Sequence, residues 1–143
     1  MSRAIDVAIA ETADEDLVSA MAHLLPQLSS SVPDAQRLRE VLACPCTTLL
    51  IARNAGKIVG TLTLAIFPIP TGVRAWIEDV VVDSEARGAG VGEALTRKAL
   101  EIALSRKART VELTSNPKRL AANRLYQKLG FKPRETNVYR YTP

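Results

Sequence analysis

The sequence Arg87-Gly88-Ala89-Gly90-Val91-Gly92 places three glycines between a strand-like run, Trp76–Val82, and a helix-like run, Val91–Ser105. Glycine lets the backbone approach a ligand closely and adopt positive φ, so successive N–H groups can point at one anion. The N-terminus of the following helix adds partial positive charge at the same point. The spacing therefore predicts a phosphate-binding loop whose ligand carries a pyrophosphate.

Two common phosphate loops are excluded by the residues themselves. No Gly-Lys-Ser/Thr follows the glycines, so the loop is not a Walker A sequence. The spacing Gly88-x-Gly90-x-Gly92 also lacks the G-x-G-x-x-G pattern of a dinucleotide site. Taken alone, the segment has one structural alternative, a tight glycine turn that only starts a helix.

A second segment, Asn116–Phe131, carries Leu125-Tyr126 and ends in Leu-Gly-Phe. The two segments, in this order, resemble the GNAT superfamily of N-acetyltransferases, whose acyl-CoA loop reads Gln/Arg-x-x-Gly-x-Gly/Ala. The similarity runs from about residue 48 to residue 141. It implies that acetyl-CoA is the co-substrate. The loop residues that it assigns to acetyl-CoA are Arg87, Gly88, Ala89, Gly90, Val91 and Gly92.

One departure from the family pattern concerns asparagine. Relatives often carry Asn seven positions before the tyrosine, where this chain has Arg119. Its own asparagines, Asn116 and Asn123, lie ten and three positions before Tyr126. The resemblance implies that both contact the pantetheine arm, and capping of helix or strand ends is the alternative for each.

Composition favours one globular domain, residues 1–143, because 47% of the side chains are hydrophobic. No apolar run approaches membrane-spanning length, so a soluble cytoplasmic protein without a membrane partner is expected. Residues 61–143 hold fourteen Lys/Arg and eight Asp/Glu, whereas residues 1–60 hold five and seven. The basic half suits an anionic co-substrate, although solvated helix faces would give the same count. With 4% aromatic residues, nucleic-acid binding is not expected.

Periodicity and turn residues predict the order β-α-α-β-β-β-α-β-α-β. The strands are expected at 5–9, 48–53, 57–67, 73–82, 110–114 and 138–141. The helices are expected at 12–25, opened by a capping box at Thr12, at 34–42, at 90–105, and after Asn116, which would cap a helix with Pro117 in first position. The resemblance implies an α+β GNAT fold with a mixed, mostly antiparallel sheet of six to seven strands. The sheet would be splayed between strands 4 and 5, with about four helices on its two faces.

The run Trp76–Val82 would alternate between two faces of the sheet unless a bulge re-aims it. The resemblance implies such a bulge, which splays this strand from the next one. It also implies that the pantetheine arm pairs with backbone groups of Val80, Val81 and Val82.

Two carboxylates, Glu78 and Asp79, come just ahead of this stretch. An ammonium cannot attack a thioester, so a carboxylate that accepts its proton is the expected general base. Glu78 is predicted to be that base and Asp79 to bind the ammonium of the substrate, although the two roles can be exchanged. The sequence Glu-Asp-Val-Val-Val at residues 78–82 also resembles glucosamine-phosphate acetyltransferases, in which these acidic residues lie at the substrate.

Tyr126 is the predicted general acid, because a phenol can protonate a departing thiolate and the Leu-Tyr position implies that role. A buried packing tyrosine is the alternative. The sequence shows no serine or cysteine nucleophile in a recognisable context that could act with His23. This histidine is therefore expected to be structural or to lie on the surface.

The sequence thus predicts an acetyl-CoA-dependent N-acetyltransferase that transfers acetyl directly, through a tetrahedral intermediate, to a primary amine on a small molecule. A protein lysine or N-terminal amine is the rival acceptor, and a catalytically silent acyl-CoA-binding module is the rival of another class. Residues 113–126 are also similar to aminoalkylphosphonate acetyltransferases, for which Arg134 and Arg140 are candidates to bind an anionic group. A homodimer through edge strands is possible for this family. No metal site is expected.

Overall fold

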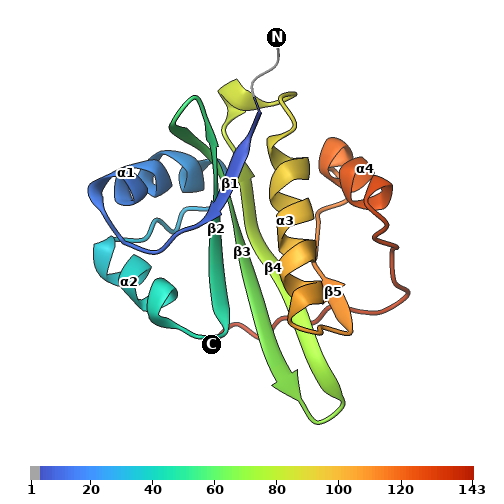
Figure 1. Ribbon diagram of the computed structural model, residues 1–143. Coiled ribbons are helices and arrows are strands. Elements are labelled where there is room, and N and C mark those ends of the chain that lie inside the picture. The colour runs from blue at the N-terminus through green and yellow to red at the C-terminus, as the bar shows by residue number, and fades with distance from the viewer. Residues whose placement is uncertain (1–3) are drawn as a thin grey trace.

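The computed structural model describes residues 4–143, which form five strands and four α-helices (Figure 1). The strands are β1 (Asp6–Ile9), β2 (Thr47–Asn54), β3 (Lys57–Ile69), β4 (Gly72–Val82) and β5 (Thr110–Glu112). The helices are α1 (Glu15–Leu24), α2 (Ala35–Ala43), α3 (Val91–Ser105) and α4 (Leu120–Lys128), with short 3₁₀ turns at η1 (Leu25–Gln27) and η2 (Ser84–Ala86). Within residues 4–143, no helix is both long and apolar enough to cross a membrane.

The strands form one sheet in the order β1-β2-β3-β4-β5, antiparallel throughout except for the parallel pair β4–β5. The β2–β3 hairpin closes at Ala55-Gly56, where both residues have positive φ (53° and 83°). Such φ values match the twist that a two-residue hairpin turn requires, which is why glycine stands here. The mixed, mostly antiparallel sheet is therefore confirmed.

Helices cover both faces of the sheet (Figure 1). On one face, the four-residue spacing of Val91, Leu95, Ala99 and Ala103 gives α3 a buried stripe that packs on the apolar side chains of β2, β3 and β4. On the other face, Leu17, Met21 and Leu24 of α1 and Leu38 of α2 pack on Leu49, Ile51, Ile58 and Val81. The sheet is thus the middle layer, with α1 and α2 on one side and α3 on the other.

Two predicted helix starts differ from the structure. Helix α1 is capped by Asp14, whose carboxylate accepts a hydrogen bond from the Leu17 N–H at 2.9 Å, and not by Thr12. Helix α4 begins at Leu120 rather than after Asn116, because the Asn116 side chain accepts from the Lys118 N–H at 2.9 Å and closes a separate turn. The helix expected at 34–42 is present as α2, and Asp34 caps it by accepting a hydrogen bond from the Arg37 N–H at 2.8 Å.

The predicted count of six to seven strands is wrong, since the structure described for residues 4–143 has five. Residues 138–141 form no strand, and Tyr139 and Tyr141 are 87% and 89% exposed. A strand needs a neighbour to satisfy its backbone groups, and this segment has none alongside it. The predicted splay is present, because β4 pairs with β5 only from Arg74 to Trp76.

Candidate active site

A β-bulge interrupts β4 at the two acidic residues. Thr63 pairs with Glu78 and Thr61 pairs with Val81, so the single residue between them on β3 faces two residues on β4. Asp79 takes the extra position with φ of 49°, in the left-handed region that asparagine and aspartate tolerate better than most residues. The bulge expected from the resemblance is confirmed.

The bulge changes which side chains share a face. Val80 and Val82 pack with the α3 layer, and Val81 packs with the α1/α2 layer, so the alternation is shifted by one position after Asp79. Because directly paired residues point the same way, Glu78 lies on the face of its partner Thr63. Glu78 and Asp79 therefore both lie on the α1/α2 face, and not on opposite faces as a flat strand would place them.

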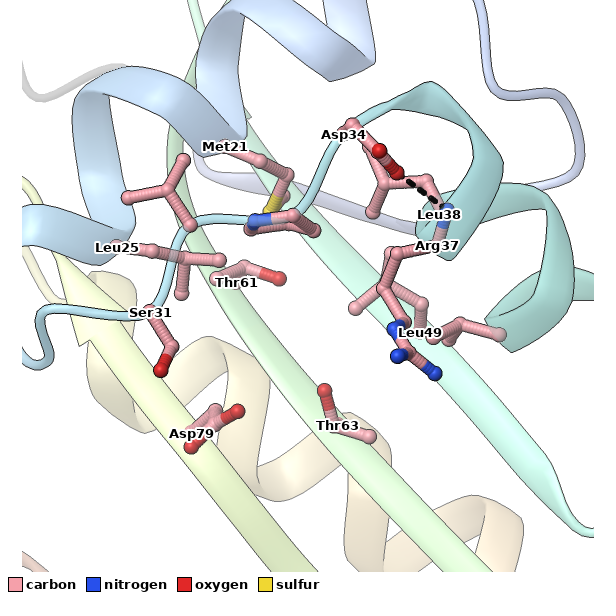
Figure 2. Close-up of a pocket in the computed structure, with 13 residues that line it drawn as sticks. Met21, Leu25, Ser31, Asp34, Arg37, Leu38, Leu49, Thr61, Thr63 and Asp79 are labelled. Carbon is pink, nitrogen blue, oxygen red and sulfur yellow. Dashed lines mark hydrogen bonds between the residues drawn. The ribbon is translucent and has the colours of Figure 1, made fainter.

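This face contains a cavity of about 620 Å³ between the sheet and helices α1 and α2. Its floor includes Thr61, Thr63 and Asp79, and Figure 2 shows the Asp79 carboxylate beside Thr63 at the sheet. Arg37 reaches in from α2, on the other side of Thr63 from Asp79 (Figure 2), and its Nη1 donates a hydrogen bond to Glu40 Oε2 at 2.9 Å. The apolar part of the wall includes Met21, Leu25, Leu38, Val41 and Leu49. The cavity thus has charged groups at two places, Asp79 on the sheet and Asp34 and Arg37 at the start of α2.

Glu78 is exposed, and its side chain is hydrogen-bonded to another residue of β4. The Trp76 indole N–H donates a hydrogen bond to Glu78 Oε1 at 2.7 Å. The two residues are two positions apart and precede the bulge, so both point to the same face. Trp76 therefore orients the Glu78 carboxylate.

Beyond Trp76, the outer edge of β4 has no neighbouring strand within residues 4–143. Val80, Val81 and Val82 lie in this part of β4, which ends next to η2 and the glycine loop. Backbone groups on an unpaired edge can hydrogen bond to an extended ligand as another strand would. The structure thus brings the three valines and the glycine loop to the same end of β4.

The glycine loop forms the N-terminus of α3. Gly88 and Gly90 have φ of 85° and 83°, and Gly90 is the N-cap of the helix. The first helical hydrogen bond runs from the Ala94 N–H to the Gly90 carbonyl, which leaves the N–H groups of the first turn free for a ligand. A Cβ atom on Gly88 or Gly90 would have no heavy atom within 4 Å. The space in front of these glycines is therefore open.

Gly92 differs from the other two glycines. A Cβ atom there would lie 3.3 Å from Leu125 Cδ2 of α4 and 3.7 Å from a methyl carbon of Val82. Gly92 therefore allows α4 to pack against the start of α3. Lys128 and Glu93 reinforce this contact with an ion pair of 2.6 Å, and that hydrogen bond, followed by the one from Arg97, lowers the pKa of Glu93.

Tyr126 is buried on α4, at 6% exposure, with its ring edge-on to Phe131 at a centroid distance of 5.7 Å. Burial raises the pKa of its phenol, and the nearby charge of Arg119 opposes this only in part. The phenol therefore keeps its proton throughout the neutral range. Within the described residues, no hydrogen bond from the hydroxyl to another side chain is found, so the proton remains available for a ligand.

Asn116 and Asn123 both make hydrogen bonds within the protein. Asn123 donates from Nδ2 to the carbonyls of Asn116 and Arg119, both at 2.9 Å. These bonds join α4 to the turn before it, which supports the capping alternative for both residues. Arg134 is likewise occupied, in an ion pair of 2.9 Å with Glu112, and neither it nor Arg140 lines the cavity.

His23 has a structural partner that the sequence did not predict. Its Nε2 lies 3.1 Å from Oδ2 of Asp83, a residue only 2% exposed at the end of β4. Burial acts to raise the Asp83 pKa, but hydrogen bonds from the Glu85 N–H and His23, with the charge of His23, lower it overall. Gln27 of η1 accepts from the Ser84 N–H at 3.1 Å. Helix α1 is thus tied to the strand end that leads into the glycine loop.

Comparison with known proteins identifies the family to which this fold belongs. Residues 15–131 match the model of the acetyltransferase (GNAT) family. The chain belongs to this family. A stretch of 95 residues is 42% identical to the glucosamine 6-phosphate N-acetyltransferase of Trypanosoma brucei brucei, covering 64% of this chain and 63% of that protein. The chain spans less than two thirds of the length of the curated relatives that it matches.

Solved structures show the same GNAT fold over nearly the whole chain. An acetyltransferase from Trypanosoma brucei superposes with a TM-score of 0.80 at 28% identity, covering 97% of this chain and all of that one. A protein described as a transcriptional regulator from Bacillus halodurans C-125 also superposes with a TM-score of 0.80, at 29% identity over 96% of this chain and all of that one.

Sequence reasoning missed several residues of this GNAT chain that shape the site. Gly60 is one of them, since a Cβ atom there would lie 2.6 Å from Val91 Cγ1 and 3.1 Å from Leu95. Its missing side chain lets the start of α3 approach the sheet. A lone glycine inside an apolar strand is a signal of close approach that the sequence does carry. Thr61, Thr63 and Arg37 carried no such signal, because only the fold brings them to one cavity.

The open space at the glycine loop leads to a test. Replacing Gly90 with Val should raise the KM for acetyl-CoA tenfold or more, about 1.4 kcal/mol, because the side chain would enter the space in front of the first turn of α3. Steady-state kinetics with varied acetyl-CoA measure the effect. Gly56→Val is the matched control, since Gly56 has the same φ of 83° and an equally open Cβ position in the β2–β3 turn. Equal KM values for the two variants would contradict the assignment of the loop.

Proposed function

We propose that this protein is an acetyl-CoA-dependent N-acetyltransferase that acts on a primary amine carried by a small molecule. The observation that supports this most directly is the bulge in β4. It places Asp79 at the floor of the cavity, on the same face of the sheet as Glu78, while the following residues of the same strand keep an unpaired edge beside the glycine loop. The same strand therefore has a cavity for the acceptor on one face and, along its unpaired outer edge, room for the co-substrate.

The residues present fit acetyl-CoA. The free N–H groups at the start of α3 and the open space before Gly88 and Gly90 suit the pyrophosphate, and the free edge at residues 80–82 suits the pantetheine arm. Arg87, exposed at the start of the loop, adds a positive charge. When bound, acetyl-CoA supplies the activated acetyl group as a thioester.

The chain itself supplies proton transfer and orientation. In this proposal Glu78, oriented by Trp76, accepts the proton of the acceptor ammonium, and Asp79 holds that ammonium at the cavity floor. The amine then attacks the thioester carbonyl, and the tetrahedral intermediate collapses as the carbon–sulfur bond breaks and the nitrogen loses its second proton to water. Tyr126, which keeps its proton in the neutral range, delivers it to the departing thiolate and is reprotonated from water. A backbone N–H near Val80 would stabilise the oxyanion.

The acceptor proposed here carries an anionic group as well as an amine. Arg37 and Asp79 lie on different walls of the cavity, and an amine that also bears a phosphate or carboxylate would satisfy both. The glucosamine 6-phosphate N-acetyltransferase relative is named for such a substrate. A cavity of this size suits a small molecule, whereas a protein acceptor would need only its terminal amine to enter.

The test is the release of free thiol from acetyl-CoA when an amine is added. Glucosamine 6-phosphate, glucosamine and a lysine peptide form the panel, and thiol release with the phosphorylated amine above the other two is expected. No thiol release with any amine would favour the silent acyl-CoA-binding module. A preference for the peptide would favour the protein acceptor.

Arg37→Ala tests the anion-binding role separately. Loss of a charged hydrogen bond is worth roughly 1.5–3 kcal/mol, so the KM for the phosphorylated amine should rise by about 10- to 100-fold. The KM for acetyl-CoA should not change. Arg39→Ala is the matched control, because Arg39 is exposed on the same helix, bonds to Gln36 at 2.8 Å and does not line the cavity. Equal KM values for the two variants would contradict the role of Arg37.

A further inference from the structure

The segment that leads into the glycine loop is held by a side chain from the end of α1. Asp83 follows β4 and caps η2: its Oδ1 accepts a hydrogen bond from the Glu85 N–H at 3.3 Å, and its Oδ2 lies 3.1 Å from Nε2 of His23. Burial acts to raise the pKa of this carboxyl, but the hydrogen bonds and the charge of His23 lower it overall. The group is therefore ionised at neutral pH. Because a carboxylate only accepts hydrogen bonds, His23 is the donor.

A second contact from the same end of α1 holds the next residue. Gln27 of η1 accepts a hydrogen bond from the Ser84 N–H at 3.1 Å through its Oε1. The Nε2 of Gln27 donates to the carbonyl of His23 at 3.4 Å, which joins the two contacts. Two side chains one helical turn apart thus hold two consecutive residues of the chain, Asp83 and Ser84.

The η2 turn connects this contact to the glycine loop. The Asp83 carbonyl accepts a hydrogen bond from the Ala86 N–H at 2.9 Å, and the Ala86 carbonyl accepts one from the Ala89 N–H at 3.4 Å. Ala89 directly precedes Gly90, the N-cap of α3. Glycine has no side chain that could fix its own backbone, so the loop depends on the residues before and after it. The placement of η2 therefore sets the placement of the loop.

The other side of η2 is less well supported. A hollow of about 470 Å³ lies between the β2–β3 turn, at Ala55 and Lys57, and the segment that contains Glu85, Ala86 and Ala89. A segment with open space behind it can move unless other contacts hold it. The hydrogen bonds from α1 and η1 are contacts of this kind.

We propose that His23 and Gln27 are positioning residues for the co-substrate: acting through Asp83 and Ser84, they hold η2 and the glycine loop in the arrangement that binds the pyrophosphate of acetyl-CoA. This inference rests on the proposed function. Without His23, the Asp83 carboxylate, in a residue only 2% exposed, would be one donor short, and η2 would shift toward another partner. The only histidine of the chain would thus act on co-substrate binding through other residues.

The test is the Kd for acetyl-CoA, measured by isothermal titration calorimetry. His23→Leu removes the donor and should raise the Kd about tenfold, the low end of what a hydrogen bond to a charged group is worth, because the effect reaches the ligand through the loop. His23→Gln keeps an N–H donor of similar reach and should restore most of the affinity. Asp16→Ala is the matched control, since Asp16 ties the other end of α1 to Arg53 at 2.9 Å, and it should leave the Kd unchanged.

Kinetics separate this role from a general effect on α1. Met21 and Leu25, in the same part of the chain, line the acceptor cavity, so a displaced α1 would also raise the KM for the acceptor. His23→Leu should instead raise the KM for acetyl-CoA and leave kcat and the KM for glucosamine 6-phosphate unchanged. Gln27→Leu, which leaves the Ser84 N–H without its acceptor, should act in the same direction.

Amide hydrogen exchange in the free protein gives a readout that needs no ligand. Amides of residues 84–92 should exchange faster in His23→Leu than in the wild type or in Asp16→Ala. Equal Kd values for His23→Leu and the wild type overturn this inference and leave the proposed activity standing. So does a His23→Gln variant that loses as much affinity as His23→Leu. A wild-type protein that does not bind acetyl-CoA overturns the proposed function and this inference with it.

Discussion

Replacing Tyr126 with Phe should lower kcat by roughly 10- to 10⁴-fold, the usual range for a general acid, while the KM for acetyl-CoA changes little. The ring fills the same space against Phe131, so packing is kept and only the proton donor is lost. Single-turnover or steady-state thiol release measures the effect. Tyr139→Phe removes the same hydroxyl from a residue that is 87% exposed near the C-terminus, and it should leave kcat unchanged.

The pH dependence of the reaction rate gives a second test of Tyr126 as the general acid. Because burial raises the pKa of the Tyr126 phenol above its ordinary value near 10, the acid form is present throughout the neutral range. The wild-type rate should therefore fall only at strongly alkaline pH, where the phenol ionises, and Tyr126→Phe should lack that fall. Wild-type kcat in the Phe variant would leave Tyr126 as a packing residue.

The second large effect is expected at the two carboxylates of β4. Glu78→Gln should lower kcat at neutral pH by roughly 10²- to 10⁴-fold and recover part of the rate at high pH, where the amine loses its proton unaided. Asp79→Asn should act chiefly on the KM for the acceptor, since that residue is proposed to hold the ammonium. A Glu78→Gln enzyme with normal kcat beside a nearly inactive Asp79→Asn enzyme would reverse the two roles.

Trp76 provides an independent check on Glu78. Trp76→Phe keeps an aromatic ring but removes the N–H that donates to Glu78 Oε1 at 2.7 Å. If Trp76 acts by orienting Glu78, its substitution should lower kcat in the wild type and have little further effect in Glu78→Gln. Additive losses in the double variant would show that Trp76 acts elsewhere. Glu85→Gln, on the exposed η2 turn, is the control for loss of a carboxylate.

The elements that local patterns determine were predicted well. The helices expected at 34–42 and 90–105 and the strands expected at 48–53 and 57–67 each depend on residues close together in the chain, and all four are found in the structure. The start of α4 was predicted too early, because Asn116 and Pro117 suit a helix N-terminus as well as the turn that they form. The predicted strand at 138–141 has suitable residues, but no side chain in it specifies which edge it joins.

The arrangement of the candidate site could be predicted only in part. The glycine loop and Tyr126 were visible because family motifs mark them. The faces of Glu78 and Asp79 depend on one extra residue in the β3–β4 register, which no local pattern reveals. The cavity depends on Thr61 and Arg37, separated by 24 positions in sequence and joined only by the fold. The His23–Asp83 contact spans 60 positions for the same reason.

The bulge has an electrostatic consequence for the order of events at the site. In the proposed function an acceptor ammonium would lie near both carboxylates, and an ammonium near two anions gives up its proton less readily than it does in water. The feature that would bind the acceptor would therefore also keep it unreactive. The rate would then depend on how far the approach of the thioester weakens this hold, so the site would couple the release of the amine's proton to the presence of the second substrate. An acceptor bound alone would stay protonated and inert.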